Sequence, residues 1–169
     1  MVAWFAVFTL CGISDVKAQA PATPLTVQTL SNQLTTPEDI ARFIWRNFRV
    51  ESDRVQFGRE EHWQSPEELL SNQKGDCEDF ALFASQILKS KGVTAFLVNV
   101  YGDKFAHTVC IFKENGKFHV LDGDTVKRCN ADNLTDIFSK IYPFWKEAAI
   151  VAYCSPSDCG RILKTFKNE

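Results

Sequence analysis

The chain has 169 residues, of which 45% are hydrophobic, so it can bury one ordinary core and a single domain is expected. Its net charge is -2 at neutral pH, and its Lys and Arg residues are scattered along the sequence. This pattern lacks the electrostatic footprint of a nucleic-acid-binding protein, so no nucleic-acid partner is predicted.

Residues 1–20 are typical of a signal peptide. A short apolar run over residues 1–13 precedes the small-residue cleavage pattern Ala-Gln-Ala at residues 18–20. The run is too short to cross a bilayer, so no stable membrane span is predicted. The alternative is a buried N-terminal helix. The sequence therefore predicts an exported protein, periplasmic or secreted.

Residues 21–35 are rich in Pro, Thr and Gln and predict a linker, which leaves residues 36–169 as the folded domain. Thr36 and Pro37 supply a helix cap and a first-turn proline, and apolar residues follow at helical spacing as far as Phe48. This pattern predicts a core helix.

A second helix start is present at Ser65-Pro66-Glu67-Glu68. In a capping box, Glu68 would reach back to the Ser65 amide, so a short helix is expected to run to about Asn72. This helix would lead the chain into a glycine at position 75.

The segment Gly75–Ala81 reads Gly-Asp-Cys-Glu-Asp-Phe-Ala and places Cys77 at the start of a further helix. Apolar residues recur at spacings of three and four from Phe80 to Leu88, and Gly92 is a stop signal. A helix N-terminus and a nearby imidazolium both lower the pKa of a thiol, whereas the neighbouring carboxylates oppose ionisation. Cys77 is therefore a candidate nucleophile, and the alternative is a buried structural thiol.

The hydrophobic period changes to two after this helix. Strands are predicted over residues 93–101, 105–112 and 117–122, with Asn115-Gly116 as a hairpin turn. A capped helix is expected to start near residue 133, and a further strand is expected over residues 148–153. Helices followed by antiparallel strands predict an α+β fold.

The hairpin register brings His107 close to a carboxylate. If Glu114 pairs with Lys117, the ladder places His107 opposite Asp124 and makes Asp122 its diagonal neighbour on the same face, roughly 7–8 Å away at the backbone. An imidazole needs an acceptor at one nitrogen to present the other as a base, so Asp122 is its expected partner, with Asp124 competing for the role. The alternatives are a histidine packed in the core and a turn aspartate.

Five cysteines remain after removal of the signal peptide, which is an odd number. One free thiol, at Cys77, and two disulfides would account for them, and four cysteines allow three pairings. A zinc site would need Cys129 and His119 beside the C-terminal pair, but the spacing lacks a second paired motif. The cysteines expected to form disulfides are Cys110, Cys129, Cys154 and Cys159.

Together these residues resemble the transglutaminase-like superfamily, and within it the bacterial transglutaminase-like cysteine peptidases. The resemblance rests on the order Cys, His, Asp, on Gly-Asp-Cys-Glu-Asp-Phe-Ala at a helix start, and on Trp-Gln-Ser-Pro-Glu-Glu-Leu over residues 63–69. It covers about residues 37–124. It implies a papain/transglutaminase-like core in which N-terminal helices pack on an antiparallel sheet.

The resemblance implies Cys77 as the nucleophile, His107 as the general base and then acid, and Asp122 as the residue that orients the imidazole. The reaction would pass through a thioester acyl-enzyme. The Cys77 amide would meet the oxyanion together with a second donor, for which Gln56 and Trp63 are candidates.

The resemblance also implies possible calcium binding through Asp76 and Glu78, because some periplasmic peptidases of this family bind calcium through acids flanking the nucleophile. Two carboxylates are too few for a site of six to eight oxygens, so other ligands would be needed. The alternative is that these acids stabilise the helix dipole. The proposed chemistry itself requires no cofactor.

Three functions follow from this reasoning. The leading hypothesis is an exported cysteine peptidase that cleaves an amide in a protein or peptide substrate. The second is a transferase that cross-links glutamine to an amine, and the third is a non-catalytic binding module that keeps the fold.

Overall fold

The computed structural model describes residues 25–155 and 158–168, so the predicted signal peptide over residues 1–20 lies outside the described ranges. The helices are α1 (Val27–Gln33), α2 (Pro37–Asn47), α3 (Asp53–Phe57), α4 (Pro66–Asn72), α5 (Cys77–Ser90) and α6 (Leu134–Ile141). The strands are β1 (Arg49–Val50), β2 (Lys74–Gly75), β3 (Ala95–Gly102), β4 (Ala106–Glu114), β5 (Lys117–Asp122), β6 (Thr125–Ala131), β7 (Trp145–Ser155) and β8 (Asp158–Lys167). No helix among the described residues is long and apolar enough to cross a membrane.

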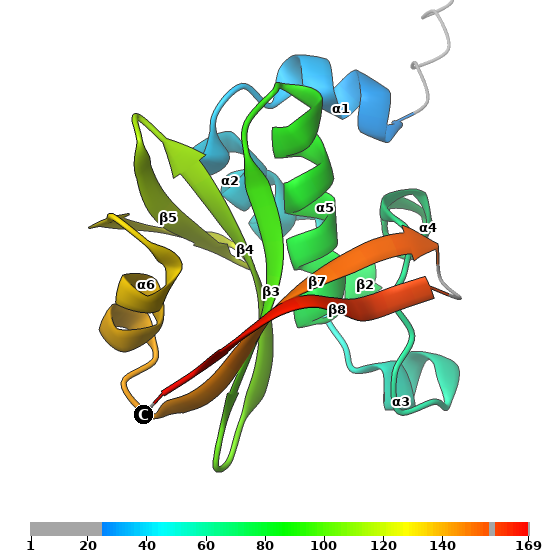
Figure 1. Cartoon of the computed structure of the whole chain (residues 1–169). Coiled ribbons are helices and arrows are strands. Elements are labelled where there is room, and N and C mark those ends of the chain that lie inside the picture. The colour runs from blue at the N-terminus through cyan, green and yellow to red at the C-terminus, as the bar shows by residue number, and fades with distance from the viewer. Residues whose placement is uncertain (1–24, 156–157, 169) are drawn as a thin grey trace, which may run out of the picture.

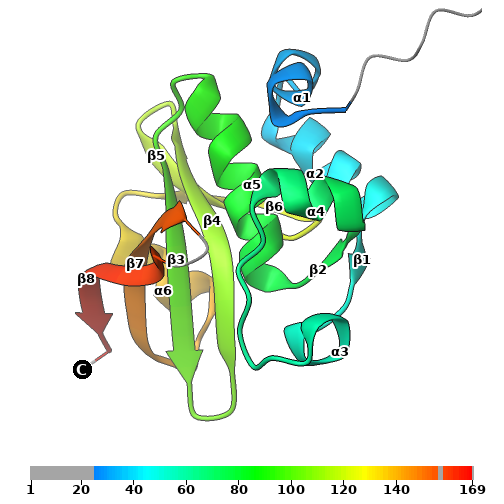
Figure 2. The same cartoon turned by 90° about the vertical axis from the view of Figure 1, so that its right-hand side faces the viewer.

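The centre of the fold is a six-stranded antiparallel sheet of order β6-β5-β4-β3-β7-β8. Figure 1 shows α1, α2 and α5 on one side of this sheet and α6 on the other, and Figure 2 shows α4 beside α5. Each face of the sheet has its own buried cluster: one packs around α5 with Phe83 and Leu97, the other around α6 with Phe138 and Val109. The predicted α+β plan is confirmed.

The predicted helix starts are correct because capping side chains are present at each. Thr36 Oγ1 accepts a hydrogen bond from the Asp39 amide at 3.1 Å at the start of α2, and Asn133 accepts one from Asp136 at 3.0 Å before α6. Helix α5 buries the apolar face expected from its period, and Gly92, with φ +74°, lies just past its end.

The hairpin register is also as predicted, with Glu114 opposite Lys117 and positive φ at Asn115 and Gly116. Two strands of the sheet, β6 and β8, were not expected from the sequence. Both are edge strands with many exposed polar residues, so they lack the alternation that predicts a half-buried strand.

Part of the predicted linker over residues 21–35 is helical, so that prediction is wrong for α1. Thr26 Oγ1 caps this helix by accepting a hydrogen bond from the Thr29 amide at 3.1 Å, and Leu30 is buried in the α5-side core. Val27 and Leu34 also pack on this core, and Lys91 Nζ donates to the Ser31 carbonyl, so α1 is held against the domain.

Only one of the two hydrogen bonds of the capping box predicted at α4 is formed. Ser65 Oγ accepts a hydrogen bond from the Glu68 amide at 3.1 Å, but the Glu68 carboxylate binds His62 Nε2 at 2.9 Å rather than the Ser65 amide. The imidazole therefore takes the carboxylate that the local pattern assigned to the backbone.

The predicted disulfides are absent from the part of the chain that the structure describes. Cys110 is buried on the α5 face of the sheet, Cys129 packs on the α6 face, and Cys154 is exposed near the tip of the β7–β8 hairpin. These separate positions prevent pairing among the three thiols, so the prediction of two disulfides among Cys110, Cys129, Cys154 and Cys159 is wrong.

Candidate functional site

Cys77 is the first residue of α5, and a network of buried contacts explains the sequence around it. A Cβ on Gly75 would lie 2.5 Å from Asp79 Oδ2, so glycine leaves room for that carboxylate. Asp79 accepts hydrogen bonds from the Gln64 amide at 2.8 Å, Gln64 Nε2 at 2.6 Å and the Asp76 amide at 3.2 Å. These contacts hold the turn that places Cys77 at the positive end of the helix dipole.

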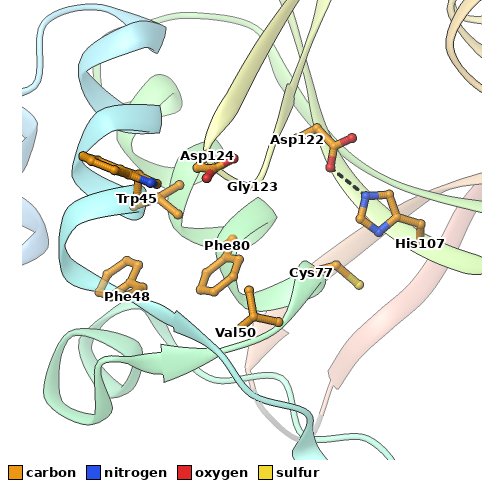
Figure 3. A pocket seen from close by; sticks show the side chains of 10 residues that line it. Trp45, Phe48, Val50, Cys77, Phe80, His107, Asp122, Gly123 and Asp124 are labelled. Atoms are coloured by element: carbon orange, nitrogen blue, oxygen red, sulfur yellow. Dashed lines mark hydrogen bonds and ion pairs between the residues drawn. The ribbon is translucent and has the colours of Figure 1, made fainter.

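His107 is held by Asp122. His107 Nε2 lies 2.6 Å from Asp122 Oδ1, while Asp122 Oδ2 accepts from Lys127 Nζ at 2.6 Å and from Tyr142 Oη at 3.4 Å. Burial raises the pKa of Asp122, but the hydrogen bonds and charges of His107 and Lys127 outweigh it and lower that pKa to about 2. Figure 3 shows the imidazole between Asp122 and Cys77, so its second nitrogen, Nδ1, is left for the thiol.

The end of the β4–β5 pairing creates the opening for these side chains. The ladder ends at Cys110 and Leu121, after which β4 continues beside β3 and Asp122 pairs with β6. The predicted pairing of His107 with Asp124 is therefore not formed, although the predicted approach of His107 to Asp122 is. The β4–β5 ladder thus ends before His107 and Asp122, and both side chains line one cavity with Cys77.

Two cavities share Cys77 and His107. The first measures about 430 Å³ and has more apolar side chains in its lining, and the second measures about 340 Å³ and has more polar ones. The first is lined by Ile44, Trp45, Phe48, Val50, Cys77, Phe80, His107, Asp122, Gly123 and Asp124 (Figure 3). The second is lined by Glu61, Trp63, Cys77, Glu78, Asn99, Tyr101, Ala106, His107, Thr108, Cys159 and Gly160. The site is thus a cleft with two halves that share these two residues.

The thiol of Cys77 points toward the carboxylate of Glu78. Cys77 Sγ donates to Glu78 Oε2 at 3.1 Å. Burial and the negative charge of Glu78 raise the pKa of Cys77 to about 12, although the Thr108 backbone amide favours the thiolate. Of the opposing influences expected from the sequence, burial and the neighbouring carboxylate outweigh those that favour the thiolate in this arrangement. To meet His107, the side chain of Cys77 must rotate away from Glu78.

Four carboxylates gather beside Cys77. Oxygens of Asp53, Glu61 and Glu78 lie within 4.8 Å of one another, and Asp76 approaches both Asp53 and Glu78. Burial, with nearby negative charge, raises the pKa of Asp53 and Glu61 and raises that of Glu78 to about 9. Within the described structure, Asp53 Oδ1 and Asp76 Oδ1 are buried without a hydrogen-bond partner. Crowded, unpaired oxygens of this kind suit a hard cation such as Ca²⁺.

Asp124, Trp63 and Gln56, the other site residues considered from the sequence, differ in their position relative to Cys77 and His107 and in what they contact. Asp124 is exposed in the β5–β6 turn and accepts a hydrogen bond from Thr125 Oγ1 at 3.0 Å, so Asp122 holds the position beside His107. Trp63 lines the second cavity. Gln56 lies in α3 and is not among the described residues that line either cavity at Cys77.

Sequence reasoning missed a polar group in the second cavity. Thr108 Oγ1 donates to Asn99 Oδ1 at 2.9 Å, and Asn99 Nδ2 donates to Tyr101 Oη at 3.0 Å. These contacts fix the orientation of the Asn99 amide and leave one of its two N–H groups for another acceptor. The available signal was an asparagine inside an apolar strand run, but one of its partners, Thr108, comes from the neighbouring strand β4.

Comparison with solved structures supports the same fold. Legionella pneumophila LapG in its calcium-bound form aligns with 72% of this chain and 71% of its own at 21% identity, with a TM-score of 0.52. LapG in its EGTA-treated form aligns with 80% of this chain and 78% of its own at 20% identity, again with a TM-score of 0.52. At these identities the likeness concerns the fold. No curated protein matches the chain.

A family model described as a transglutaminase-like domain matches residues 23–135. The match includes α5 with Cys77, β4 with His107 and β5 with Asp122, and it extends over more than half of the sequence. The chain therefore belongs to the transglutaminase-like domain family.

Proposed function

We propose that the chain is an exported, thiol-dependent amide hydrolase that acts on proteins or peptides. The observation that carries the proposal is the imidazole of His107, which is held by Asp122 at 2.6 Å and lines one cleft with Cys77. A thiol at a helix start, a base and a residue that orients the base form the arrangement used in nucleophilic catalysis of acyl transfer.

In the proposed cycle, His107 Nδ1 takes the proton of Cys77 after the thiol rotates away from Glu78. The thiolate attacks the amide carbonyl, and the imidazolium of His107 gives its proton to the leaving amine, which leaves a thioester on Cys77. A water molecule then attacks the thioester and gives a proton to His107, and the carboxylic acid product departs as the thiol re-forms. Asp122 stabilises the imidazolium at both steps, and its low pKa keeps it charged at neutral pH.

The oxyanion of the tetrahedral intermediate needs hydrogen-bond donors. The proposal assigns these to the Cys77 backbone amide and to Asn99 Nδ2, because Asn99 lines the cavity beside Cys77 in an orientation fixed by Thr108 and Tyr101. Trp63 lines the same cavity, but its ring stacks on Tyr153 with centroids 6.3 Å apart.

Asn99→Ala is expected to lower kcat by about 10²–10³ and to change KM little, because an oxyanion donor acts mainly in the transition state. Thr108→Val keeps the side-chain shape and removes the hydroxyl that orients Asn99. It should therefore lower kcat too, but by less than Asn99→Ala does. Steady-state kinetics on one cleavable peptide measures both effects. A large loss of kcat in Trp63→Phe with none in Asn99→Ala would show that the Trp63 indole, and not Asn99, is the second donor to the oxyanion.

Calcium binding is also part of the proposal. The LapG structure named above is described as calcium-bound. In this chain Asp53, Glu61, Asp76 and Glu78 would hold the ion, and they include the two unpaired buried oxygens. A bound Ca²⁺ would supply positive charge that offsets the repulsion among these carboxylates beside the thiol.

Adding Ca²⁺ to the EGTA-treated protein is expected to raise the thermal midpoint by roughly 5–10 °C when the ion is present at about 100 times its Kd. Glu61→Gln should remove most of this shift, as measured by differential scanning calorimetry. Glu60→Gln is the matched control, since Glu60 is the adjacent carboxylate, is exposed and pairs with Arg54 at 3.5 Å. Equal shifts in both variants would show that Glu61 is not a ligand.

The reaction class is tested by incubating the protein with casein in H₂¹⁸O, with and without a dansylated primary amine. Hydrolysis introduces ¹⁸O into new carboxyl groups, whereas glutamine transfer incorporates the amine. Hydroxylamine should intercept the thioester as a hydroxamate in either case. A protein with intact fold that gives none of these products under Ca²⁺ would be a binding module.

A further inference from the structure

We propose that the apolar half of the cleft binds a bulky apolar side chain of the peptide substrate, close to the amide that is cleaved, and that Trp45 and Val50 determine this preference. The proposal rests on the proposed amide hydrolase activity and specifies its substrate class. It concerns the cavity of about 430 Å³ in Figure 3, hereafter the apolar groove.

The inner wall of the apolar groove is built from core side chains. Ile44 and Phe48 lie in and just after α2, and Phe80 belongs to α5 one turn after Cys77. These three side chains are 3%, 8% and 6% exposed, so the domain core holds them in place. The wall is therefore rigid, apolar and adjacent to the reacting sulfur.

The rim of the groove is apolar too, but it is left open to solvent. Trp45 is 66% exposed and Val50 is 82% exposed, although both line the groove. Exposed aromatic and β-branched side chains around a concave apolar surface are typical of a binding site, since covering them releases water. The continuity of the groove with Cys77 and His107 indicates that its occupant is the chain being cleaved.

The part of the groove formed by Gly123 and Asp124 favours a neutral backbone rather than an acidic side chain. Gly123 has φ +54° and open space at its Cβ position, so an extended peptide can pass close to it. Beyond Gly123 lies the exposed carboxylate of Asp124, whereas the charge of Asp122 is compensated by Lys127 at 2.6 Å. Acidic substrate residues at this position are repelled, whereas Leu or Phe gains contact with Trp45 and the core wall.

The test uses blocked hexapeptide amides that carry Leu, Ser or Asp at each position in turn, with kcat/KM measured by mass spectrometry in the presence of Ca²⁺. The wild type is expected to favour Leu over Ser at one position by about tenfold or more, and to cleave the Asp peptide slowest. Trp45→Ala and Val50→Ser should reduce the Leu/Ser ratio severalfold. Phe144→Ala is the control, because Phe144 is 81% exposed and does not line the groove. An unchanged ratio in Trp45→Ala overturns the proposal.

A binding measurement separates this inference from the activity itself. Cys77→Ala is titrated with the same peptides while tryptophan emission is recorded. Trp45 is exposed whereas Trp63 and Trp145 are 6% and 2% exposed, so the Leu peptide should shift the emission to shorter wavelength by covering Trp45. Trp45→Phe should abolish the shift. If no peptide is cleaved but the shift occurs, the hydrolase proposal fails and the groove assignment stands. If the shift is absent at millimolar peptide, the groove assignment fails.

Discussion

Cys77→Ser is expected to lower kcat for peptide cleavage by on the order of 10⁴–10⁶, because the variant loses the sulfur that forms the thioester. The substitution changes one atom at the first position of α5, so the capping contacts of Asp79 with Gln64 and Asp76 remain. Circular dichroism and the thermal midpoint should stay close to those of the wild type. The effect is measured by steady-state cleavage and by loss of the hydroxamate formed with hydroxylamine.

Cys154→Ser is the matched control. Cys154 is the exposed thiol of the β7–β8 hairpin, and its removal should leave kcat within about twofold. A protein that keeps its cleavage activity in Cys77→Ser, or loses it in Cys154→Ser, would contradict the assignment of the nucleophile.

Alkylation of Cys77 tests the environment of the thiol independently of any substrate. Burial and Glu78 raise the pKa of Cys77 to about 12, so labelling at pH 7 in EGTA should be slow. The pKa of Glu78 is about 9, so Glu78→Gln removes a charge that is present above that pH, and labelling should become faster chiefly there. Peptide mass mapping against pH identifies which thiol reacts.

Asp122→Asn is expected to lower kcat by about 10³–10⁴, since the amide neither stabilises the imidazolium nor selects the tautomer that leaves His107 Nδ1 as a base. Asp124→Asn is the control, because it removes an adjacent carboxylate that is exposed and bonded to Thr125. It should change kcat by less than about threefold. Equal losses in the two variants would contradict the orienting role of Asp122.

The same substitution has a predictable effect on stability. The pKa of Asp122 is lowered to about 2 in the folded chain and is near 3.9 in the unfolded chain, so its ionised form stabilises the fold above pH 4 by roughly 2 kcal/mol. This contribution is lost as the pH falls through 2. The free energies of unfolding of Asp122→Asn and wild type should therefore differ at pH 7 and converge near pH 2 in urea titrations.

Local patterns were sufficient for most elements of the fold. Caps such as Thr36 and Asn133, the helical period after Cys77 and the Asn115-Gly116 turn depend on neighbours within a few residues, so the chain order alone specifies them. The approach of His107 to Asp122 was also predictable, because hairpin register is set by the turn. Strands β6 and β8 escaped prediction because edge strands need no apolar alternation.

The sequence by itself determined the candidate residues for the proposed chemistry: a cysteine at a helix start and a histidine and an aspartate on successive strands. The tertiary structure decided their environment. Glu78 and burial raise the thiol pKa, α3 brings Asp53 to Asp76, and Asn99 finds its partners on β3 and β4. Such properties depend on desolvation and on charges that are distant in the chain, so no local pattern encodes them.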